Sequence, residues 1–193
     1  ARVPLRFEAV PRHHAGPPDK KEEGRKMNLM YAMSVPVFVK SLGSLSAILD
    51  KAAAHAEARK IDPSVLLAAR LYPDMFALTK QVQVACDFAK GSVARLAGQE
   101  PPKYDDTETT IDALKARIAR TITFVQGFAE SQFEGSETRE ISLKIRDQVL
   151  TYKGYPYLAH IALPNFFFHA VTAYDILRHN GVELGKRDFI GTV

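Results

Sequence analysis

Cysteine is nearly absent from this chain, and tryptophan is absent altogether. Cys86 is the one cysteine in 193 residues, which excludes an internal disulfide framework. A protein without such a framework suits a reducing compartment, so we expect a cytoplasmic location. Cys86 follows the apolar residues Val84 and Ala85 and has no marked catalytic partner. The sequence therefore favours an inert core thiol over a nucleophile.

Long apolar runs and signature motifs are also lacking. No stretch approaches the roughly 18 apolar residues that a transmembrane helix needs, so no membrane partner is expected. The patterns GxSxG, GxGxxG, HExxH and CxxC and the P-loop do not occur. Their absence removes the strongest sequence signals for hydrolases, nucleotide-binding proteins and zinc proteases. Whether the protein is an enzyme stays open at this point.

Excess charge of one sign is lacking from most of the chain. The whole sequence has 26 Lys and Arg against 22 Asp and Glu, and seven and four of these lie within residues 1–26. Residues 27–193 therefore hold 19 basic and 18 acidic groups, which nearly cancel. A nucleic-acid-binding surface needs basic groups gathered on the folded domain, so no nucleic-acid partner is expected.

The first 26 residues differ in composition from the rest. They contain four prolines, two glycines and a run of charges, without apolar periodicity. Such a segment cannot bury enough surface to offset the entropy lost on ordering, so we expect a disordered leader or an added tail. Met27 is a plausible natural start. The predicted folded domain is residues 27–193.

Apolar residues at intervals of three and four predict four amphipathic helices, at about 33–59, 73–98, 108–131 and 156–179. Between the first two, a short apolar patch indicates a turn of helix or a packed loop. Pro164 interrupts the last helix, and we expect a kink there because the apolar stripe continues across the proline.

A change of period follows the third helix. Ile141, Leu143 and Ile145 alternate with polar residues, which is typical of a half-buried strand, and a second short strand follows a turn near Arg146–Asp147. A hairpin alone is marginally stable, so it should pack against the helices. The predicted fold is all-α: a four-helix bundle with a small β-hairpin between helices three and four.

Polar residues interrupt two of the apolar stripes. Gln81 lies three residues after Leu78 on the inward face of the second helix, and Asn165 and His169 share one face of the fourth. A buried amide or imidazole without a partner costs roughly 1–3 kcal/mol, so these side chains must satisfy each other, hold water or bind something.

Three interpretations of this polar centre stay open. The first is a satisfied network, with Gln81 bonded to His169 directly. The second is a small-molecule pocket between helices. The third is a divalent metal site, zinc or nickel, with His169 as a ligand and His160 swung inward by the kink; carboxamides are poor zinc ligands beside imidazole.

Three long segments carry a resemblance to a known family: "MSVPVFVKSLGSLSAILDKAAAHAEARKID", "YPDMFALTKQVQVACDFAKGSVARLAG" and "YLAHIALPNFFFHAVTAYDILRHNGVELGKRDFIG". Together they resemble an uncharacterised branch of the DinB/YfiT-like superfamily. The resemblance covers about residues 27–193 and implies an up-down-down-up four-helix bundle, often a homodimer. Many relatives bind a divalent metal through three histidines, and some are thiol-dependent transferases.

The resemblance also places the family's ligand positions. Aligning the family's "LLR" with Ile176–Leu177–Arg178 puts its HxxxH pair on Asn165 and His169, and its remaining histidine at Gln81 or as far as Gln83. Only His169 keeps the ligand type. We therefore expect an uncharacterised DinB-like bundle with a polar centre in place of the full metal site. The alternative is a divalent-metal-dependent transferase or hydrolase acting on a small substrate such as a thiol.

Overall fold

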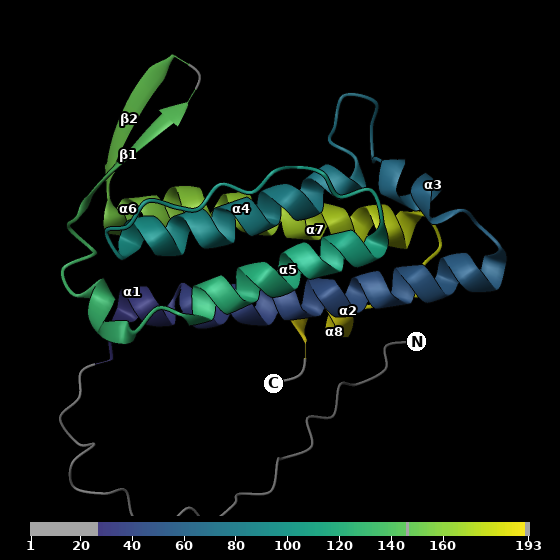
Figure 1. Ribbon diagram of the computed structural model, residues 1–193, viewed down its shortest axis with the longest axis horizontal. Coiled ribbons are helices and arrows are strands. Elements are labelled where there is room, and N and C mark those ends of the chain that lie inside the picture. Colours follow the sequence, from purple (N-terminus) through teal and green to yellow (C-terminus); the bar gives the residue numbers. More distant parts are fainter. Residues whose placement is uncertain (1–26, 146, 192–193) are drawn as a thin grey trace, which may run out of the picture.

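The computed structural model describes residues 27–145 and 147–191, and the expected leader, residues 1–26, lies outside them (Figure 1). The long helices are α2 (Val35–Arg59), α4 (Leu78–Leu96), α5 (Ile111–Gln126) and α7 (Leu163–His179). The shorter ones are α1 (Leu29–Ala32), α3 (Pro63–Ala68), the 3₁₀ turn η1 (Glu130–Phe133), α6 (Gly154–Tyr157), the π-helical turn η2 (Leu158–Ala162) and α8 (Lys186–Ile190). Strands β1 (Glu140–Ile145) and β2 (Gln148–Lys153) complete the described elements.

The four long helices pack in a closed ring, in which α2 and α4 each contact both α5 and α7. A long connector between α4 and α5 returns along the molecule, so that α5 begins at the end opposite to where α4 finishes (Figure 1). The predicted apolar stripes fill the middle of the ring, where Leu42, Val82, Leu114 and Ile176 are fully buried. Burial of these side chains is the main force that holds the helices together.

Helix α2 is more apolar than the sequence analysis allowed. Within the helical run Leu29–Arg59, an 18-residue window has a mean hydropathy of 1.5, and the run is long enough, by length and composition, to cross a membrane. The statement that no stretch approaches a membrane span was therefore too strict. The core helix of a bundle meets the same criterion, and the stripe of Phe38, Leu42 and Leu49 is fully buried here.

Helix α4 begins at Leu78, so the predicted start at Pro73 was wrong. The backbone N–H of Leu78 donates to the carbonyl of Ala69 at 2.9 Å, and the side chain of Gln81 donates to the carbonyl of Phe76 at 3.1 Å. These bonds hold the preceding residues as a loop after α3, the short helix that the apolar patch had indicated. Pro73 lies inside that loop instead of opening the helix.

Helix α5 is shorter than the predicted 108–131. Thr110 caps its start, since the Thr110 hydroxyl oxygen accepts the backbone N–H of Ala113 at 3.1 Å. The helix ends at Gln126, where Gly127 follows, and the chain turns into η1. Glycine lowers helix propensity by about 1 kcal/mol relative to alanine, which favours an end at this point.

The last predicted helix is continuous from Gly154 to His179, through α6, η2 and α7. A kink was expected at Pro164; the structure has a π-helical turn immediately before this proline, in which the N–H of Leu163 donates to the carbonyl of Leu158. Proline has no N–H to donate, and a π-helical turn is one way in which a helix accommodates that loss.

The hairpin is present, with Ile141 opposite Tyr152 and Leu143 opposite Leu150. It projects from one end of the molecule (Figure 1). Its base packs on the core, since Ile141 is 3% exposed, whereas Val149 is 65% exposed. Gly154 closes this base, because a Cβ there would lie 1.8 Å from the carbonyl oxygen of Ser136. The expected packing of the hairpin against the helices therefore holds for its base alone.

Candidate functional site

Helices α4 and α7 bring Gln81 and His169 together. Both side chains face inward, as their spacing predicted, with 1% of Gln81 and 9% of His169 exposed. The Nδ1 atom of His169 lies 2.6 Å from Oε1 of Gln81, which is a short hydrogen bond. This bond links two residues that are 88 positions apart in the chain.

The amide of Gln81 determines which ring nitrogen of His169 carries the proton. Because Nε2 of Gln81 donates to the Phe76 carbonyl, its Oε1 can only accept. Nδ1 of His169 is therefore the donor, and Nε2 of the neutral ring keeps its lone pair. Within residues 27–145 and 147–191, that Nε2 atom has no hydrogen-bond partner.

Aromatic rings surround the His169 imidazole. Phe76 and Phe88 lie roughly parallel to it, with ring centroids at 6.5 and 6.1 Å, and Phe168 meets it edge-on at 5.2 Å. Burial in this setting lowers the pKa of His169 below its ordinary value of 6.5, so the ring is neutral at pH 7. The centre is thus an uncharged hydrogen-bonded pair in an apolar shell.

Two of the four predicted pocket residues lie elsewhere. The Nδ2 atom of Asn165 donates to the carbonyl of Ile161 at 2.7 Å, and the residue lines a groove beside the hairpin, one helical turn away from His169. His160 is exposed, because the π-helical turn does not bring it inward. Gln83, the alternative position for the second-helix ligand, donates to the carboxylate of Glu108 at 2.8 Å.

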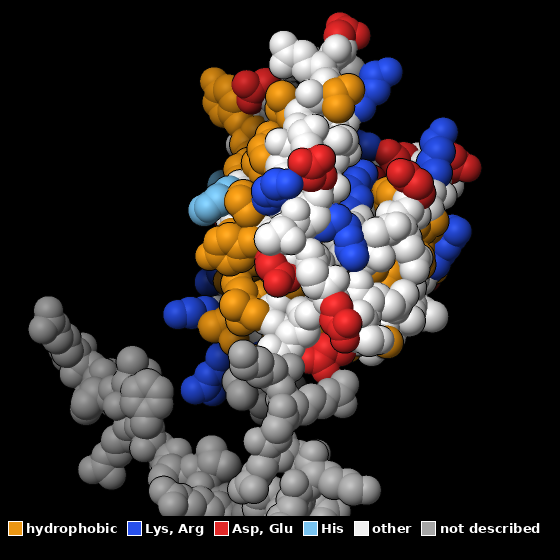
Figure 2. Space-filling view, turned by 90° about the vertical axis from the view of Figure 1, so that its left-hand side faces the viewer, with side chains coloured by type: hydrophobic (Ala, Val, Ile, Leu, Met, Phe, Trp, Pro, Cys, Tyr) orange, Lys and Arg blue, Asp and Glu red, His pale blue; other side chains and the backbone are white. Residues whose placement is uncertain are grey.

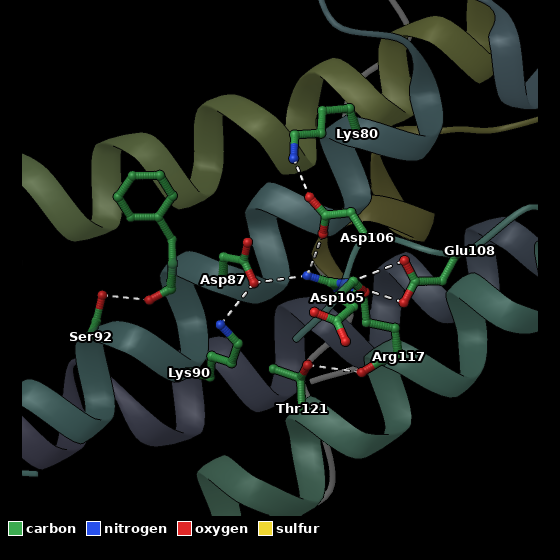
Figure 3. A network of polar contacts seen from close by, with 10 residues as sticks. Lys80, Asp87, Lys90, Ser92, Asp105, Asp106, Glu108, Arg117 and Thr121 are labelled. Carbon is green, nitrogen blue, oxygen red and sulfur yellow. Dashed lines mark hydrogen bonds and ion pairs between the residues drawn. The ribbon is translucent and has the colours of Figure 1, made fainter. Parts of the chain in front are cut away.

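A charged cluster around Arg117 was not predicted (Figure 3). This side chain of α5 is 4% exposed, and its guanidinium lies 2.9 Å from Asp87 of α4 and 3.1 Å from both Asp106 and Glu108 of the connector. Burial alone would lower the pKa of Arg117, but the hydrogen bond to Glu108 and the charge of Asp87 outweigh that effect and raise it.

Further cations and Tyr104 extend the Arg117 cluster. Lys80 pairs with Asp106 at 2.5 Å and holds the pKa of that carboxyl below its usual range, while Lys90 pairs with Asp87 at 2.8 Å. The guanidinium of Arg120 lies 3.9 Å from the centre of the Tyr104 ring. The cluster fastens the connector between α4 and α5 to both helices. Its position in the sequence gave one signal: Arg117 falls between Leu114 and Ile118 on the buried stripe.

Cys86 belongs to the core next to this cluster. It is fully buried, and burial raises the pKa of its thiol to about 12. A thiol with so high a pKa is protonated at neutral pH and is a poor nucleophile. The predicted core position of Cys86 is confirmed, and the raised pKa agrees with the prediction that this thiol is inert.

A groove of about 850 Å³ lies between β1, the C-terminal half of α4 and the start of α7. Its walls include the apolar side chains of Phe88, Leu143 and Ile161, together with the polar groups of Arg95 and Asn165. Phe88 lines the groove and also lies parallel to the His169 ring, so it is the residue shared by the groove and the surroundings of the Gln81–His169 pair. Its volume lies within the range of small-molecule pockets, and its lining holds more polar and charged residues than most of them have.

Comparison with models of protein families identifies the family of this chain. A family model described as "Domain of unknown function (DUF1993)" matches residues 30–190, which is most of the chain. The chain belongs to the DUF1993 family. The curated proteins include no significant match to it.

This DUF1993 protein is also similar to a solved structure, described as the crystal structure of a DinB family member protein from Shewanella denitrificans. The two share 47% sequence identity with a TM-score of 0.81, and the match covers 86% of this chain and 94% of the other. The resemblance to the DinB-like proteins that the sequence suggested is therefore confirmed.

The DinB resemblance implies a divalent metal, and the donor set here does not fit one. His169 offers one imidazole nitrogen, the amide of Gln81 is bonded to Nδ1 and to Phe76, and Asn165 faces the groove. Among the residues that the structure describes, no group of three His, Cys, Asp or Glu side chains is placed to hold a metal ion. The three-histidine site has no counterpart in these residues.

Proposed function

We propose that this DUF1993 protein is a metal-independent, non-catalytic bundle that binds a small molecule in the groove beside the hairpin. In this proposal the long helices have the up-down-down-up arrangement of the DinB-like proteins. The Gln81–His169 pair joins α4 to α7 and supports the groove from behind. The hydrogen bond of 2.6 Å between these two side chains carries the proposal.

That bond matters because it satisfies Nδ1 of His169 and Oε1 of Gln81, the two buried atoms that face each other, without a ligand. The amide of Gln81 uses Oε1 for His169 and Nε2 for the Phe76 carbonyl. A buried polar pair with its bonds made is stable by itself, whereas an unsatisfied one would call for water or an ion. In this proposal the polar centre has a structural role, and the small molecule binds in the neighbouring groove.

Metal analysis of protein purified without an affinity tag tests this proposal. We expect far less than one equivalent of zinc or nickel, and no change in the unfolding temperature when a chelator is added. His169→Ala is compared with His160→Ala, because His160 is an exposed imidazole on the same helical run. One equivalent of metal that His169→Ala loses and His160→Ala keeps would overturn the proposal.

A second candidate function is a divalent-metal-dependent transferase or hydrolase acting on a small substrate such as a thiol. One feature favours it: Nδ1 of His169 donates to a carboxamide oxygen while Nε2 keeps its lone pair, as in many metal-bound imidazoles. That enzyme would need further ligands from substrate, water or another chain. The same metal analysis separates the two functions.

We also propose a cytoplasmic homodimer without nucleic-acid or membrane partners. The outer side of α7 supports association, since Phe168 is 57% exposed and Val171, three residues further on, is 39% exposed. Hydrophobic side chains gather in a column along one edge of the molecule in Figure 2. Sedimentation equilibrium of the protein and of Phe168→Ser tests the dimer, which the substitution should weaken; a monomer at all concentrations would contradict it.

A further inference from the structure

The residues that line the groove beside the hairpin indicate which class of ligand it binds. We propose that it takes an organic anion, a carboxylate or phosphate joined to an apolar body, with Arg95 and Arg139 binding the charged end. This inference rests on the proposed ligand-binding function and names the chemical class of the ligand. Two guanidinium groups line this groove without forming an ion pair with an acid among the described residues.

The side chain of Arg95 lines the groove and runs back along α4 to Gly91. Its Nη1 atom is 3.4 Å from the hydroxyl of Tyr157, a side chain that is almost fully buried. Gly91 makes this position available, because a Cβ at Gly91 would lie 2.6 Å from the same Nη1 atom. The hydroxyl of Tyr157 is further supported by Ser92 at 3.3 Å. Arg95 is therefore held in place from two sides.

Arg139 reaches the groove from the start of the hairpin. One of its N–H groups donates to the carbonyl of Leu96 at the end of α4. Its guanidinium packs over Gly98, where an added Cβ would lie 3.4 Å from the guanidinium carbon. Because a guanidinium has five N–H donors, Arg95 and Arg139 each keep several after these contacts.

The acids around the groove leave these two arginines unpaired. In the part of the chain that the structure describes, no carboxylate forms an ion pair with Arg95 or Arg139. Asp87 forms ion pairs with Lys90 and Arg117, and Glu140 forms one with Lys153. The remaining charged groups of the lining are Glu100 and Lys144, which offset each other. By formal charge the lining is balanced, with three basic and three acidic groups, but Arg95 and Arg139 are its two guanidinium groups left without an ion-pair partner in the described chain.

The apolar residues of the lining indicate that the other end of the ligand is hydrophobic. Phe88, Ile141, Leu143 and Ile161 supply apolar walls from α4, β1 and η2. Guanidinium groups bind carboxylates and phosphates through paired, charge-assisted hydrogen bonds. A ligand that satisfies both parts of the groove has an anionic head and a hydrophobic body of about one ring.

Binding of matched probes tests the inference. Benzoate, phenyl phosphate, benzyl alcohol and inorganic phosphate are titrated into ¹⁵N-labelled full-length protein at constant ionic strength. We expect benzoate or phenyl phosphate to shift amide signals of residues 95–100 and 139–144, and to bind at least about tenfold more tightly than benzyl alcohol. The stronger of the two identifies the head group. Inorganic phosphate, which lacks the apolar body, should bind more weakly than phenyl phosphate.

Variants connect the binding to the arginines. Arg95→Gln and Arg139→Gln should each weaken binding of the anion by about tenfold, whereas Arg178→Gln, an exposed arginine at the far end of α7, should leave it unchanged. Gly91→Ala keeps every charge but displaces the Arg95 guanidinium, so it should weaken binding severalfold without lowering the unfolding temperature. Gly43→Ala is its control, since a Cβ at Gly43 meets no atom within 4 Å.

The possible outcomes separate this inference from the proposed function. If benzyl alcohol binds in the groove as tightly as the anions, and Arg95→Gln changes neither, the ligand-binding function stands and the anion inference is wrong. If no probe shifts the signals of the groove, both are wrong. Tight binding of the anions with the expected losses in Arg95→Gln and Gly91→Ala supports both.

Discussion

Helix α4 carries two buried polar centres that differ in kind. Toward α7, Gln81 and His169 form a neutral pair joined by one short hydrogen bond. Toward α5, Asp87 takes part in the charged Arg117 cluster, which spans two helices and a connector. The neutral pair costs little to bury once its bonds are made, whereas removing one partner of a buried ion pair leaves an uncompensated charge and is strongly destabilising. The difference predicts which centre the fold depends on more.

Removing the charge of Arg117 should have the largest effect. Arg117→Met keeps much of the side-chain volume but leaves Asp87, Asp106 and Glu108 without their shared cation. Breaking a buried ion pair from one side costs about 3–5 kcal/mol, and because Asp87 is partly exposed we expect a loss of about 3 kcal/mol. Urea unfolding at pH 7 measures it.

Arg120→Met is the matched control for this substitution. Arg120 is exposed on the same helix and contacts the Tyr104 ring without an acid partner in the cluster. We expect it to cost less than about 1 kcal/mol. Equal losses for the two variants would mean that the Arg117 cluster contributes no more than an ordinary surface contact.

The neutral pair should give a smaller loss. Gln81→Ala and His169→Ala each leave one buried polar partner unsatisfied, at a cost of about 1–3 kcal/mol. Because the two side chains bond to each other, the double variant should be more stable than the sum of the single losses implies, by about 1 kcal/mol. A double-mutant cycle in urea measures this coupling. Strictly additive losses would show that the hydrogen bond contributes nothing to stability.

The pH dependence of stability sharpens the same comparison. The pKa of His169 lies below 6.5 in the folded protein and at its ordinary value after unfolding, so between these values the unfolded chain binds more protons. The stability contribution of the neutral ring is present in full above pH 6.5 and is lost as the pH falls through the folded pKa. Unfolding free energies at pH 7.5 and 5.5 should therefore differ less in His169→Gln than in the wild type.

His160→Gln serves as the control, because His160 is exposed on the same helical run. It should keep the pH dependence of the wild type. If His160→Gln and His169→Gln flattened the pH dependence equally, the effect would not come from the buried imidazole.

Local periodicity was enough to predict the parts of the fold that depend on neighbouring residues. The stripe of Leu42 and Leu49 follows from helical spacing, and so does the inward face of Gln81 and His169. The start of α4 could not be predicted, because it depends on a bond between the Leu78 N–H and the Ala69 carbonyl that only the folded loop provides. Pro73 is an equally good first residue of a helix when its tertiary surroundings are ignored.

The site shows the same division. Asn165 and His169 share a helix face, but a helical turn separates them along the axis, and only His169 is level with Gln81. Arg117 had one signal, its place on a buried stripe, yet its partners Asp106 and Glu108 come from a connector whose course no periodicity determines. Sequence spacing thus predicts which face of a helix a side chain lies on. It does not predict which residue of a neighbouring element that side chain contacts.

The central claim is that His169 donates from Nδ1 to Gln81 and binds no metal. Two-dimensional ¹H–¹⁵N NMR of the imidazole at pH 7.5, with and without equimolar zinc, tests it most directly. The account predicts a protonated Nδ1 and an unprotonated Nε2, with signals that zinc leaves unchanged and that Gln81→Ala alters. A protonated Nε2, or ring signals that move to a zinc-bound position at one equivalent, would contradict it.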